Sequence, residues 1–599
     1  FSSEVLSEAE VFDFVNRTAR QQLSTVRGAR FPLPAGGAPR QIVVDIDPDA
    51  LRARGLSPAD VTQAIVAQNL TLPTGNVRMG EQELRVSLNS SPPDIASLND
   101  MPVQRVDGRT VFVRDVAFVH DGNAIQTNVA RRDGTRAIIL SVLKSGGDAS
   151  TTQITADIRE LLPRLQASAP PGLEIEVLSD QSVFVSRAVS GLVIEACIAA
   201  GLTALLILLF LGSVRSTLIV ITSIPLSILA TAVVMRAMGG TVNVMTLGGM
   251  ALAVGILVDD ATVEIENVHR HLGMGKTLTR AILDGANEIA LPALVTSLSI
   301  GIVFISLVVL EGPTRYLFLP MGLAVGISVM FSYFLSRTVV PTMMRSLSRD
   351  HTHPPVPSFF WFGRGIAAFE RGFTRLRSGY ETLLNDSLHA RVLVLLAFTL
   401  ALGAGAFGLT QLGRDFFPVI DAGRIRMHLT AAPGTRIEET ERLVARAGDV
   451  IRRVIPEHDR TRILDLVGIP GAYTMAVTDT TSMTTADAEI MVNLSPDRTG
   501  STLDYQRALR TAMNEELPEV RIHFDAADMM TQIANFGISA AVDVQITSMD
   551  RARSLTVARA LREELSHVPG LVDVRRQQVG DAPRLHIEVD RARLAEAGL

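Results

Sequence analysis

The sequence predicts a membrane protein that combines an α-helical transmembrane bundle with α+β domains outside the bilayer. Six separate stretches hold about 20 mainly apolar residues, the length that a helix needs to cross roughly 30 Å of hydrocarbon. The segments before residue 187 and after residue 414 instead alternate short strand and helix patterns. Two adjacent aspartates, Asp259 and Asp260, lie inside the third apolar stretch.

Composition supports this class. The chain has 599 residues, of which 47% are hydrophobic, and a mean hydropathy of +0.28, so it is too long for one domain and too apolar for a wholly soluble protein. A net charge of −6 gives no reason to expect a nucleic-acid partner. The single cysteine, Cys197, excludes an intrachain disulfide. The chain begins with Phe1 and no secretory signal follows, so we expect a fragment.

The expected transmembrane segments are, in chain order, Gly191–Leu211, Ser216–Met235, Val244–Val263, Ala290–Leu310, Phe318–Met344 and Val392–Leu412. Alternate connections between them are rich in lysine and arginine: Arg215 in the first, Arg270, Lys276 and Arg280 in the third, and seven arginines between Arg345 and Arg391 in the fifth. The other connections hold only Arg236 and Arg315. Because basic connections stay in the cytoplasm, both large soluble regions are expected in the periplasm of a double-membraned bacterium.

The long basic connection contains an amphipathic pattern over Ser358–Leu384, with apolar residues at helical spacing and arginines on the other side. This pattern favours a helix that lies along the cytoplasmic face of the membrane. An ordinary packed helix of a small cytoplasmic domain is the alternative.

The outer regions contain strand–helix–strand units, which indicate small α+β subdomains. The expected units comprise 136–144, 151–165 and 173–180; then 425–433, 436–454 and 462–468; and finally 488–496, 502–517 and 520–526. A faint repeat relates Val44–Leu56 to Ile587–Leu599, which share Asp, Leu, Gly and Leu at identical spacing. Each copy is expected to follow a strand and open a helix, as in the duplicated halves of many transporters.

The aspartate pair is the candidate site. One aspartate at the centre of a span costs about 2.5–3.5 kcal/mol on insertion, and intramembrane carboxylates usually serve as proton or ion relays. Neighbouring residues on a helix point about 100° apart, so Asp259 and Asp260 can face the bundle interior only toward two different helices. Burial and mutual repulsion both favour protonation of one carboxyl, and the two would titrate as a coupled pair. The alternatives are a pair neutralised by a structural cation, or a helix of a soluble core.

The segment GILVDDATVEIENVHRHL, Gly255–Leu272, resembles the fourth-helix signature of the resistance–nodulation–division (RND) transporters, in their hydrophobe/amphiphile or acriflavin-resistance multidrug-efflux branch. Ala50–Asn69 is similar to the docking-domain motif of that family, and Arg114–Val119, Leu211–Leu229 and Leu409–Gly423 also match. The resemblance extends along essentially the whole chain.

This resemblance implies a homotrimeric, proton-driven antiporter of the bacterial inner membrane that works with a periplasmic adaptor and an outer-membrane channel. It needs no cofactor besides protons and exports amphiphilic or hydrophobic compounds from the periplasm or the inner leaflet. The implied domains are a porter subdomain at 1–40 and 124–186, a docking insertion at 41–123, five helices at 187–345, a cytoplasmic linker at 346–390, a sixth helix at 391–413, two porter subdomains at 414–583 and the start of a second docking insertion at 584–599.

The resemblance also implies a proton relay of Asp259 and Asp260, with Glu195 of the first span as a further acidic position. The relay lysine of the family is not found here, because Lys144 and Lys276, the only lysines, lie outside the spans. Gly248, Gly249, Ala251, Ala253 and Gly255 give this helix a slim surface for close packing. Glu264 and Glu266 lie nearer the cytoplasmic end, where a solvated face is expected; Glu264 departs from the apolar residue usual in the family.

For substrate binding the implied region is the glycine-rich switch loop, Val467–Met483, and its neighbours. Its candidate residues are Tyr473, Met475, Met483 and Met491, although core packing explains each methionine equally well.

Three rival functions stay open. Heavy-metal efflux within the same superfamily could use Met529 and Met530 as soft ligands, but that branch typically has one aspartate where this chain has two. An intramembrane aspartyl protease would place its aspartates on two helices, whereas both lie on one helix here. A non-transporting receptor of the same fold is the third.

Overall fold

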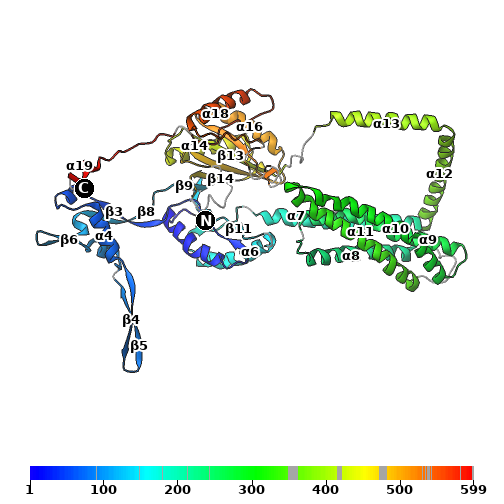
Figure 1. The fold of residues 1–599 in the computed structure, drawn as a ribbon, viewed down its shortest axis with the longest axis horizontal. Coiled ribbons are helices and arrows are strands. Elements are labelled where there is room, and N and C mark those ends of the chain that lie inside the picture. The colour runs from blue at the N-terminus through cyan, green and yellow to red at the C-terminus, as the bar shows by residue number, and fades with distance from the viewer. Residues whose placement is uncertain are drawn as a thin grey trace. The chain divides into compact units, whose positions relative to one another are not determined.

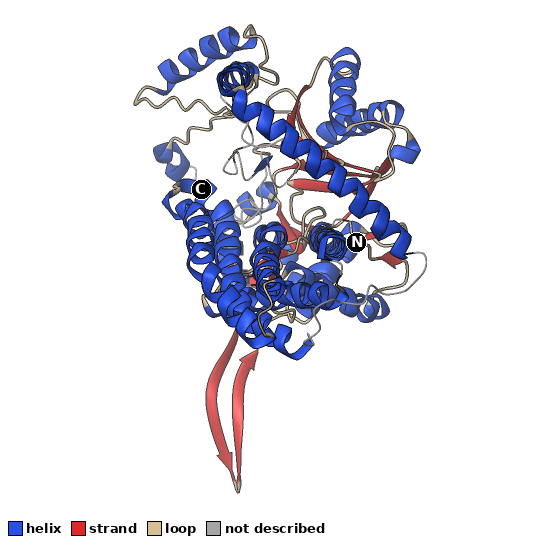
Figure 2. Cartoon of the chain, turned by 90° about the vertical axis from the view of Figure 1, so that its right-hand side faces the viewer, coloured by secondary structure: helices blue, strands red, loops and turns tan. Residues whose placement is uncertain are grey.

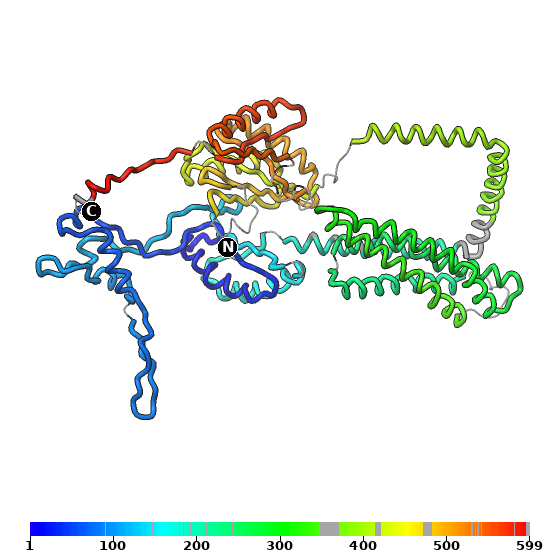
Figure 3. Tube along the Cα trace, viewed as in Figure 1, coloured from blue at the N-terminus to red at the C-terminus, as the bar shows by residue number. Residues whose placement is uncertain are grey.

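The computed structural model describes residues 1–599 except 90, 147–148, 179, 212, 242, 348–361, 414–420, 471–481, 529–530, 533–534, 536–537, 539, 541, 580–581 and 597–599. The chain divides into two compact units. The soluble unit comprises Phe1–Ala149, Ala156–Leu178 and Val419–Leu599, and the membrane unit comprises Ser150–Thr155 and Ser179–Pro418. Figure 3 follows the chain from the first part of the soluble unit, through the membrane unit, and back.

Among the residues that the structure describes, the membrane unit contains six helices long and apolar enough to cross a bilayer. They are α7 (Gln181–Leu211), α8 (Val214–Ala237), α9 (Val244–Gly273), α10 (Leu278–Ile305, continued by the 3₁₀ turn η3, Ser306–Val309), α11 (Gly312–Leu347) and α13 (Arg391–Gln411). Each of the six predicted spans lies within one of these helices, to within one residue. Several helices extend beyond their apolar stretch, because polar residues continue the helix past the expected bilayer boundary.

Helix α9 contacts α7, α8, α10 and α11, which lie side by side in Figure 1. Its closest approach is to α11: a Cβ added to Gly249 would lie 2.6 Å from the carbonyl oxygen of Met321. The buried core of the bundle includes Ile219, Val254 and Val340. In contrast, all residues of α13 are exposed. Helix α12 (Phe362–His389) confirms the predicted helix in the basic connection, although Ser358–Trp361 lie outside the described residues.

The centre of the soluble unit is a six-stranded antiparallel sheet in the order β10-β9-β14-β15-β13-β16. Its strands are β9 (Asn128–Arg132), β10 (Thr135–Ala137), β13 (Arg424–Thr430), β14 (Arg460–Gly468), β15 (Asp487–Leu494) and β16 (Arg521–Asp525). The first two precede the transmembrane helices and the other four follow them. The porter segments expected as separate subdomains therefore share one sheet.

Helices α14 (Ile437–Val454) and α16 (Thr502–Glu516) cover one face of this sheet. Alternate strand residues such as Ile425, Met427 and Leu429 pack against them, as period-2 patterning requires. The predicted elements of both C-terminal units are confirmed to within a few residues.

Two predicted strands are shorter than expected. The segment 136–144 divides into β10 and β11 (Leu143–Lys144), because β11 leaves the central sheet and pairs with β2 (Ala29–Arg30). The segment 173–180 retains only β12 (Leu173–Glu174), which pairs with β1 (Ser2–Ser3). Helix α6 (Thr151–Ser168) is confirmed. Its Leu165 packs with residues of the N-terminal helical segment, which comprises α1 (Glu8–Asp13), η1 (Phe14–Ala19) and α2 (Arg20–Leu23).

Residues 40–123 form a separate subregion with small cores of its own. Its elements are β3 (Arg40–Ile46), α3 (Pro48–Arg52), α4 (Pro58–Gln68), β4 (Thr71–Met79), β5 (Gln82–Asn89), α5 (Ile95–Asn99), β6 (Pro102–Val106), β7 (Arg109–Phe112), η2 (Val113–Asp115) and β8 (Ala117–Asn123). Strands β4 and β5 make a long hairpin that projects away from the rest (Figure 2), and all their described residues are exposed.

The repeat is partly confirmed. Asp47 caps α3 by accepting hydrogen bonds from the backbone amides of Asp49 and Ala50, at 2.9 and 3.0 Å. Asp590 caps α19 (Arg591–Glu596) in the same way, through the amides of Ala592 and Arg593. Both copies therefore open a helix, but only the first follows an assigned strand, and Gly598 and Leu599 lie outside the described residues. Helix α18 (Arg551–Ser566) precedes this region.

Candidate functional site

Helix α9 positions the aspartate pair. It begins after Asn243, whose side chain accepts hydrogen bonds from the amides of Met245 and Thr246 at 3.0 Å each. This cap satisfies amides that an intramembrane helix start would otherwise leave unpaired. Four turns later the helix presents Asp259 to the outside of the described bundle and Asp260, half-buried, to its inside. The expectation that both carboxylates face the interior is therefore met only by Asp260 within this chain.

Asp259 belongs to an exposed stripe of α9 that also contains Leu252, Gly255, Val263 and Glu266. These positions recur every three or four residues, so they lie on one face of the helix. A Cβ added to Gly255 would meet no atom within 4 Å. In the part of the chain that the structure describes, this face has no helix against it. Glu266 is exposed, as expected.

Asp260 faces two serines of neighbouring helices, Ser297 on α10 and Ser332 on α11. Both serines are buried. The hydroxyl of Ser332 donates to the carbonyl oxygen of Leu257 at 3.0 Å, and the hydroxyl of Ser297 lies near the Asp260 carboxylate. The interior around Asp260 is thus polar.

Glu264 lies one helical turn beyond Asp260 and is completely buried. Its carboxylate pairs with the guanidinium of Arg337 on α11. The expectation of a solvated face at Glu264 is therefore wrong, because α10 and α11 cover this side of α9. Sequence reasoning also missed Arg337, although an arginine inside the predicted span Phe318–Met344 was a usable signal, since such a charge requires a partner.

The polar side of α9 continues toward its basic end through Asn267 and His271. The Asn267 amide donates to the carbonyl oxygen of Gly285 at 2.8 Å. His271 Nε2 lies 2.8 Å from Glu288 Oε2, and Lys276 donates to His271 Nδ1 at 2.8 Å. Lys276 also pairs with Asp284 at 2.8 Å. Lys276 lies in the connection between α9 and α10, which confirms that it is outside the spans.

Glu195, the third expected relay residue, is exposed on α7 and makes no hydrogen bond or ion pair with any residue that the structure describes. The structure therefore does not bring it into contact with either aspartate. Among the expected substrate residues, Met483 is exposed and Met491 is half-buried on β15. Tyr473, Met475, Met529 and Met530 lie outside the described residues.

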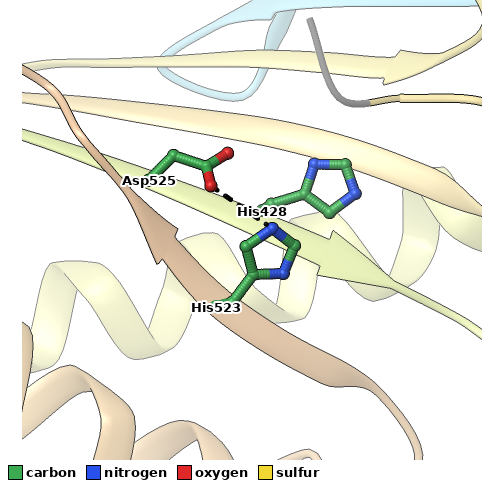
Figure 4. Close-up of side chains that lie close together, drawn as sticks. All are labelled: His428, His523 and Asp525. Carbon is green, nitrogen blue, oxygen red and sulfur yellow. Dashed lines mark ion pairs between the residues drawn. The ribbon is translucent and has the colours of Figure 1, made fainter. Parts of the chain in front are cut away.

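The face of the central sheet opposite α14 and α16 carries buried polar side chains. Figure 4 shows three of them: His428 from β13, with His523 and Asp525 from β16. His428 and His523 are directly paired across the two strands, with ring centroids 4.7 Å apart. Ligand atoms of the three residues lie within 4.8 Å of one another, a spacing that a metal ion could use.

Arginines oppose a cation at this position. Arg575 pairs with Asp525 at 3.1 Å, and Arg426 binds Glu489 through two hydrogen bonds of 2.7 and 3.1 Å. Burial, with His428 and Arg575 beside it, lowers the pKa of His523 to about 2, so its imidazole is neutral at physiological pH. The donor set suits a metal such as zinc, but its carboxylate already has a cationic partner. The arrangement fits a buried network of ion pairs better than a resident ion.

Asp487 anchors the edge of the same polar face. Burial raises the pKa of its carboxyl, but hydrogen bonds from His428, from the Met483 amide and from Thr484 outweigh this and hold the pKa at about 2. The carboxylate accepts the amides of Met483 and Thr484 at 3.1 and 2.9 Å. It therefore fixes the chain immediately after residues 471–481, where the sequence resembles a switch loop.

Comparison with known proteins places this geometry in context. A family model described as the AcrB/AcrD/AcrF family matches residues 1–599. The multidrug resistance protein MdtC of Pantoea ananatis is 26% identical over 601 residues, which cover 100% of this chain and 56% of that protein. MdtC of Pectobacterium carotovorum is 29% identical over 425 residues, or 71% of this chain and 40% of the relative.

A solved structure described as a heavy metal efflux pump matches with a TM-score of 0.79 and 23% identity, covering 99% of this chain and 56% of that one. At this identity the likeness establishes the fold alone, and it confirms the predicted fold class. The chain spans 56% of the length of that pump and of the Pantoea relative.

Proposed function

The chain belongs to the AcrB/AcrD/AcrF family of multi-pass inner-membrane RND transporters, and on that premise we propose that the protein exports amphiphilic or hydrophobic compounds in exchange for protons. The observation that carries the proposal is the adjacent pair Asp259 and Asp260 inside a transmembrane helix, with Asp260 turned into a polar interior. Membership of a transporter family leaves no role for an intramembrane protease.

In the proposed relay, Asp259 and Asp260 together take up a proton from the periplasmic side and release it to the cytoplasm. Protonation removes a charge from the bundle, and the helices around α9 then repack. One elementary charge that crosses a potential of 100 mV contributes about 2.3 kcal/mol. The exposed stripe around Asp259 supports the proposal that a second helical domain packs against α9. That domain would supply the relay lysine, which is not found among the residues of this chain. Glu195 is a weaker candidate for the relay, since it makes no contact with the pair.

We propose that the central sheet and its helices form porter subdomains, and that residues 41–123 form a docking insertion. Substrate would contact the porter region near Met483 and Met491, together with Tyr473 and Met475 from the segment that connects β14 and β15. Flexible methionines adapt to irregular apolar ligands. The names of the MdtC relatives support multidrug export.

The exposed hairpin β4–β5 supports the proposal that the protein assembles as a homotrimer. A two-stranded hairpin is marginally stable alone in water, and this one exposes Leu72, Val77, Leu84 and Val86. We propose that it inserts into a neighbouring protomer of a homotrimer, and that the trimer works with a periplasmic adaptor and an outer-membrane channel.

Heavy-metal export is the second candidate, favoured by the His428, His523 and Asp525 cluster and disfavoured by the arginines that pair with neighbouring carboxylates. A receptor that does not transport is the third. Export of both dyes and metal ions should be measured in cells that express the full-length protein. Dye export supports the main proposal, and metal export without dye export supports the second.

The relay is tested with Asp259→Asn and Asp260→Asn, made separately. We expect either change to abolish proton-dependent dye export while insertion and trimerisation persist. Normal export by both variants would refute the antiport mechanism. Loss of assembly in either variant would show a structural role instead.

A further inference from the structure

A buried ion pair lies one turn from the aspartate relay. Glu264 on α9 is 0% exposed and the side chain of Arg337 on α11 is 13% exposed. The Arg337 guanidinium is also held by the carbonyl oxygen of Ala286, which accepts from Nη1 at 3.2 Å, and lies 5.7 Å from the ring centroid of Tyr333. Contacts from α9, α10 and α11 therefore converge on this cation.

The pair does not satisfy its own hydrogen-bonding capacity. Glu264 Oε1, Arg337 Nε and Arg337 Nη2 are buried and have no hydrogen-bond partner among the described residues. A buried ion pair repays its desolvation only when the remaining donors and acceptors are satisfied. A pair built only to join two helices would not be expected to leave three such atoms open. The open atoms instead provide positions for an exchangeable proton and for a second carboxylate.

Asp260 is the next carboxylate along the inward-facing side of α9. It lies four residues before Glu264, so both side chains project from one face of α9, and Arg337 acts electrostatically on Asp260 as well. The other ionisable groups around Glu264 are Tyr333 on α11 and, further along, Glu288 on α10 and His271 on α9. Arg337 is the cation that pairs with Glu264 and also acts electrostatically on Asp260.

We propose that Glu264 is a second proton-binding carboxylate of the pump and that Arg337 is the cation that Glu264 and Asp260 share. This inference rests on the proposed antiport function. In one state Asp260 is protonated and Glu264 is ionised beside Arg337. The proton then leaves the Asp260 carboxyl, directly or through water, and binds Glu264 Oε1, and the guanidinium becomes the counter-ion of Asp260.

This exchange keeps the charge balanced. Each state contains one neutral carboxyl, one carboxylate and one guanidinium, so the net charge of the three groups is zero in both. No uncompensated charge is left in the low-dielectric interior, where it would be most costly. The guanidinium belongs to α11, and it shifts by one turn of α9 when it changes from one carboxylate to the other. The position of the proton is therefore coupled to the packing of α9 against α11.

The polar side of α9 leads onward from Glu264. Asn267 and His271 continue the same face at helical spacing, and both contact Glu288 of α10, at 3.4 and 2.8 Å. His271 in turn contacts Lys276 in the basic connection. Glu264 thus lies between the Asp260 carboxyl and a set of titratable side chains at the cytoplasmic end, where the proton is released.

The first test compares four variants of the full-length protein: Glu264→Gln, Glu264→Asp, the charge-neutral double variant Glu264→Val/Arg337→Leu, and Asp260→Asn. The double variant removes both charges together, so it leaves no unpaired ion to disrupt folding. We expect it to insert and trimerise but to export dye at least about a hundredfold more slowly, a loss within the range of a proton-transfer group. Glu264→Asp, which keeps the carboxylate, should export dye with a displaced pH profile.

Export by the double variant at the normal rate and with an unchanged pH profile would overturn the inference, because the pair would then be only structural. That result together with an inactive Asp260→Asn variant leaves the antiport function standing. Normal export by both Asp259→Asn and Asp260→Asn refutes the antiport function itself. The two failures are therefore distinguishable.

The second test detects the proton directly. Infrared spectra of the purified protein in lipid vesicles are recorded during pH titration, and the carboxylic acid C=O band of Glu264 is assigned as the band lost in Glu264→Gln. We expect this band in the unmodified protein and not in Asp260→Asn, in which Arg337 stays with Glu264. An ion pair with a purely structural role gives no Glu264 acid band in either protein, and that outcome would overturn the inference.

Discussion

Arg131 and Asp465 form a buried ion pair between two strands of the central sheet. One strand precedes the transmembrane helices in the sequence and the other follows them. Arg131 Nη2 and Nε lie 2.9 and 3.1 Å from Asp465 Oδ2, and the two side chains are 7% and 2% exposed. The residues are direct cross-strand partners of β9 and β14. The pair therefore joins two parts of the chain that are 334 residues apart.

Asp465→Ala should destabilise the soluble unit by about 3–5 kcal/mol, because it leaves the Arg131 guanidinium buried without its counter-ion. Thermal denaturation of the detergent-solubilised protein measures this loss. The double variant Arg131→Met/Asp465→Leu removes both charges and should recover most of the stability. Equal destabilisation in the single and double variants would show that packing, rather than the unpaired charge, is responsible.

His523 should make the soluble unit sensitive to acid. Its pKa is about 2 in the folded protein against an ordinary value of 6.5, so below pH 6.5 the unfolded chain binds a proton that the folded chain does not. Stability should therefore fall as pH decreases below 6.5, by about 2 kcal/mol at pH 5. Melting temperatures at pH 7 and pH 5 test this. His523→Leu should lose this dependence, whereas His567→Leu, at an exposed histidine, should retain it.

Gly249 should tolerate no side chain. An added Cβ would lie 2.6 Å from the Met321 carbonyl oxygen of α11, so Gly249→Ala forces α9 and α11 apart and should lower the melting temperature of the membrane unit. Gly273→Ala is the matched control, because a Cβ at that helical glycine meets no atom within 4 Å. A similar effect of both substitutions would argue against close packing at Gly249.

The exposed hairpin should be needed for assembly. Val77 and Leu84 are cross-strand partners on β4 and β5, and each is 45% exposed. The double change Val77→Asp/Leu84→Asp should reduce the fraction of trimer, because two charges would have to be buried in the neighbouring protomer. Native mass spectrometry or gel filtration measures this fraction. Val557→Asp, at an exposed valine of α18, should leave the trimer intact. An unchanged trimer in the hairpin variant would contradict the proposed insertion.

The sequence predicted the spans and the C-terminal strands well because each carries a clear local pattern. A run of apolar residues defines α10, and period-2 alternation defines β13. The pairing of β9 with β14 could not be predicted in this way, since it depends on segments far apart in the chain. The sheet therefore combines segments that local patterns presented as separate units.

The candidate site shows the same limit. Asp259 and Asp260 stand out from sequence because two charges in an apolar stretch are rare, but which of them faces inward depends on how α10 and α11 pack. Glu264 near a helix end seemed suited to solvent, and only the tertiary contact with Arg337 reveals it as buried. Met483, Met491 and the switch-loop candidates stay predictions, because no described contact distinguishes a ligand-binding side chain from a packed one.

The shared sheet has a consequence for biosynthesis. Strand β9 leaves the ribosome and crosses the membrane long before β14 exists to cover its edge. At roughly 5–20 residues per second, translation of the intervening segment takes tens of seconds. During that time the edge of β9 is unpaired and Arg131 has no counter-ion. The strand can therefore pair with other chains in the periplasm. The yield of this protein would therefore depend on periplasmic chaperones, or on how fast the later helices are inserted into the membrane, as much as on the stability of the folded protein.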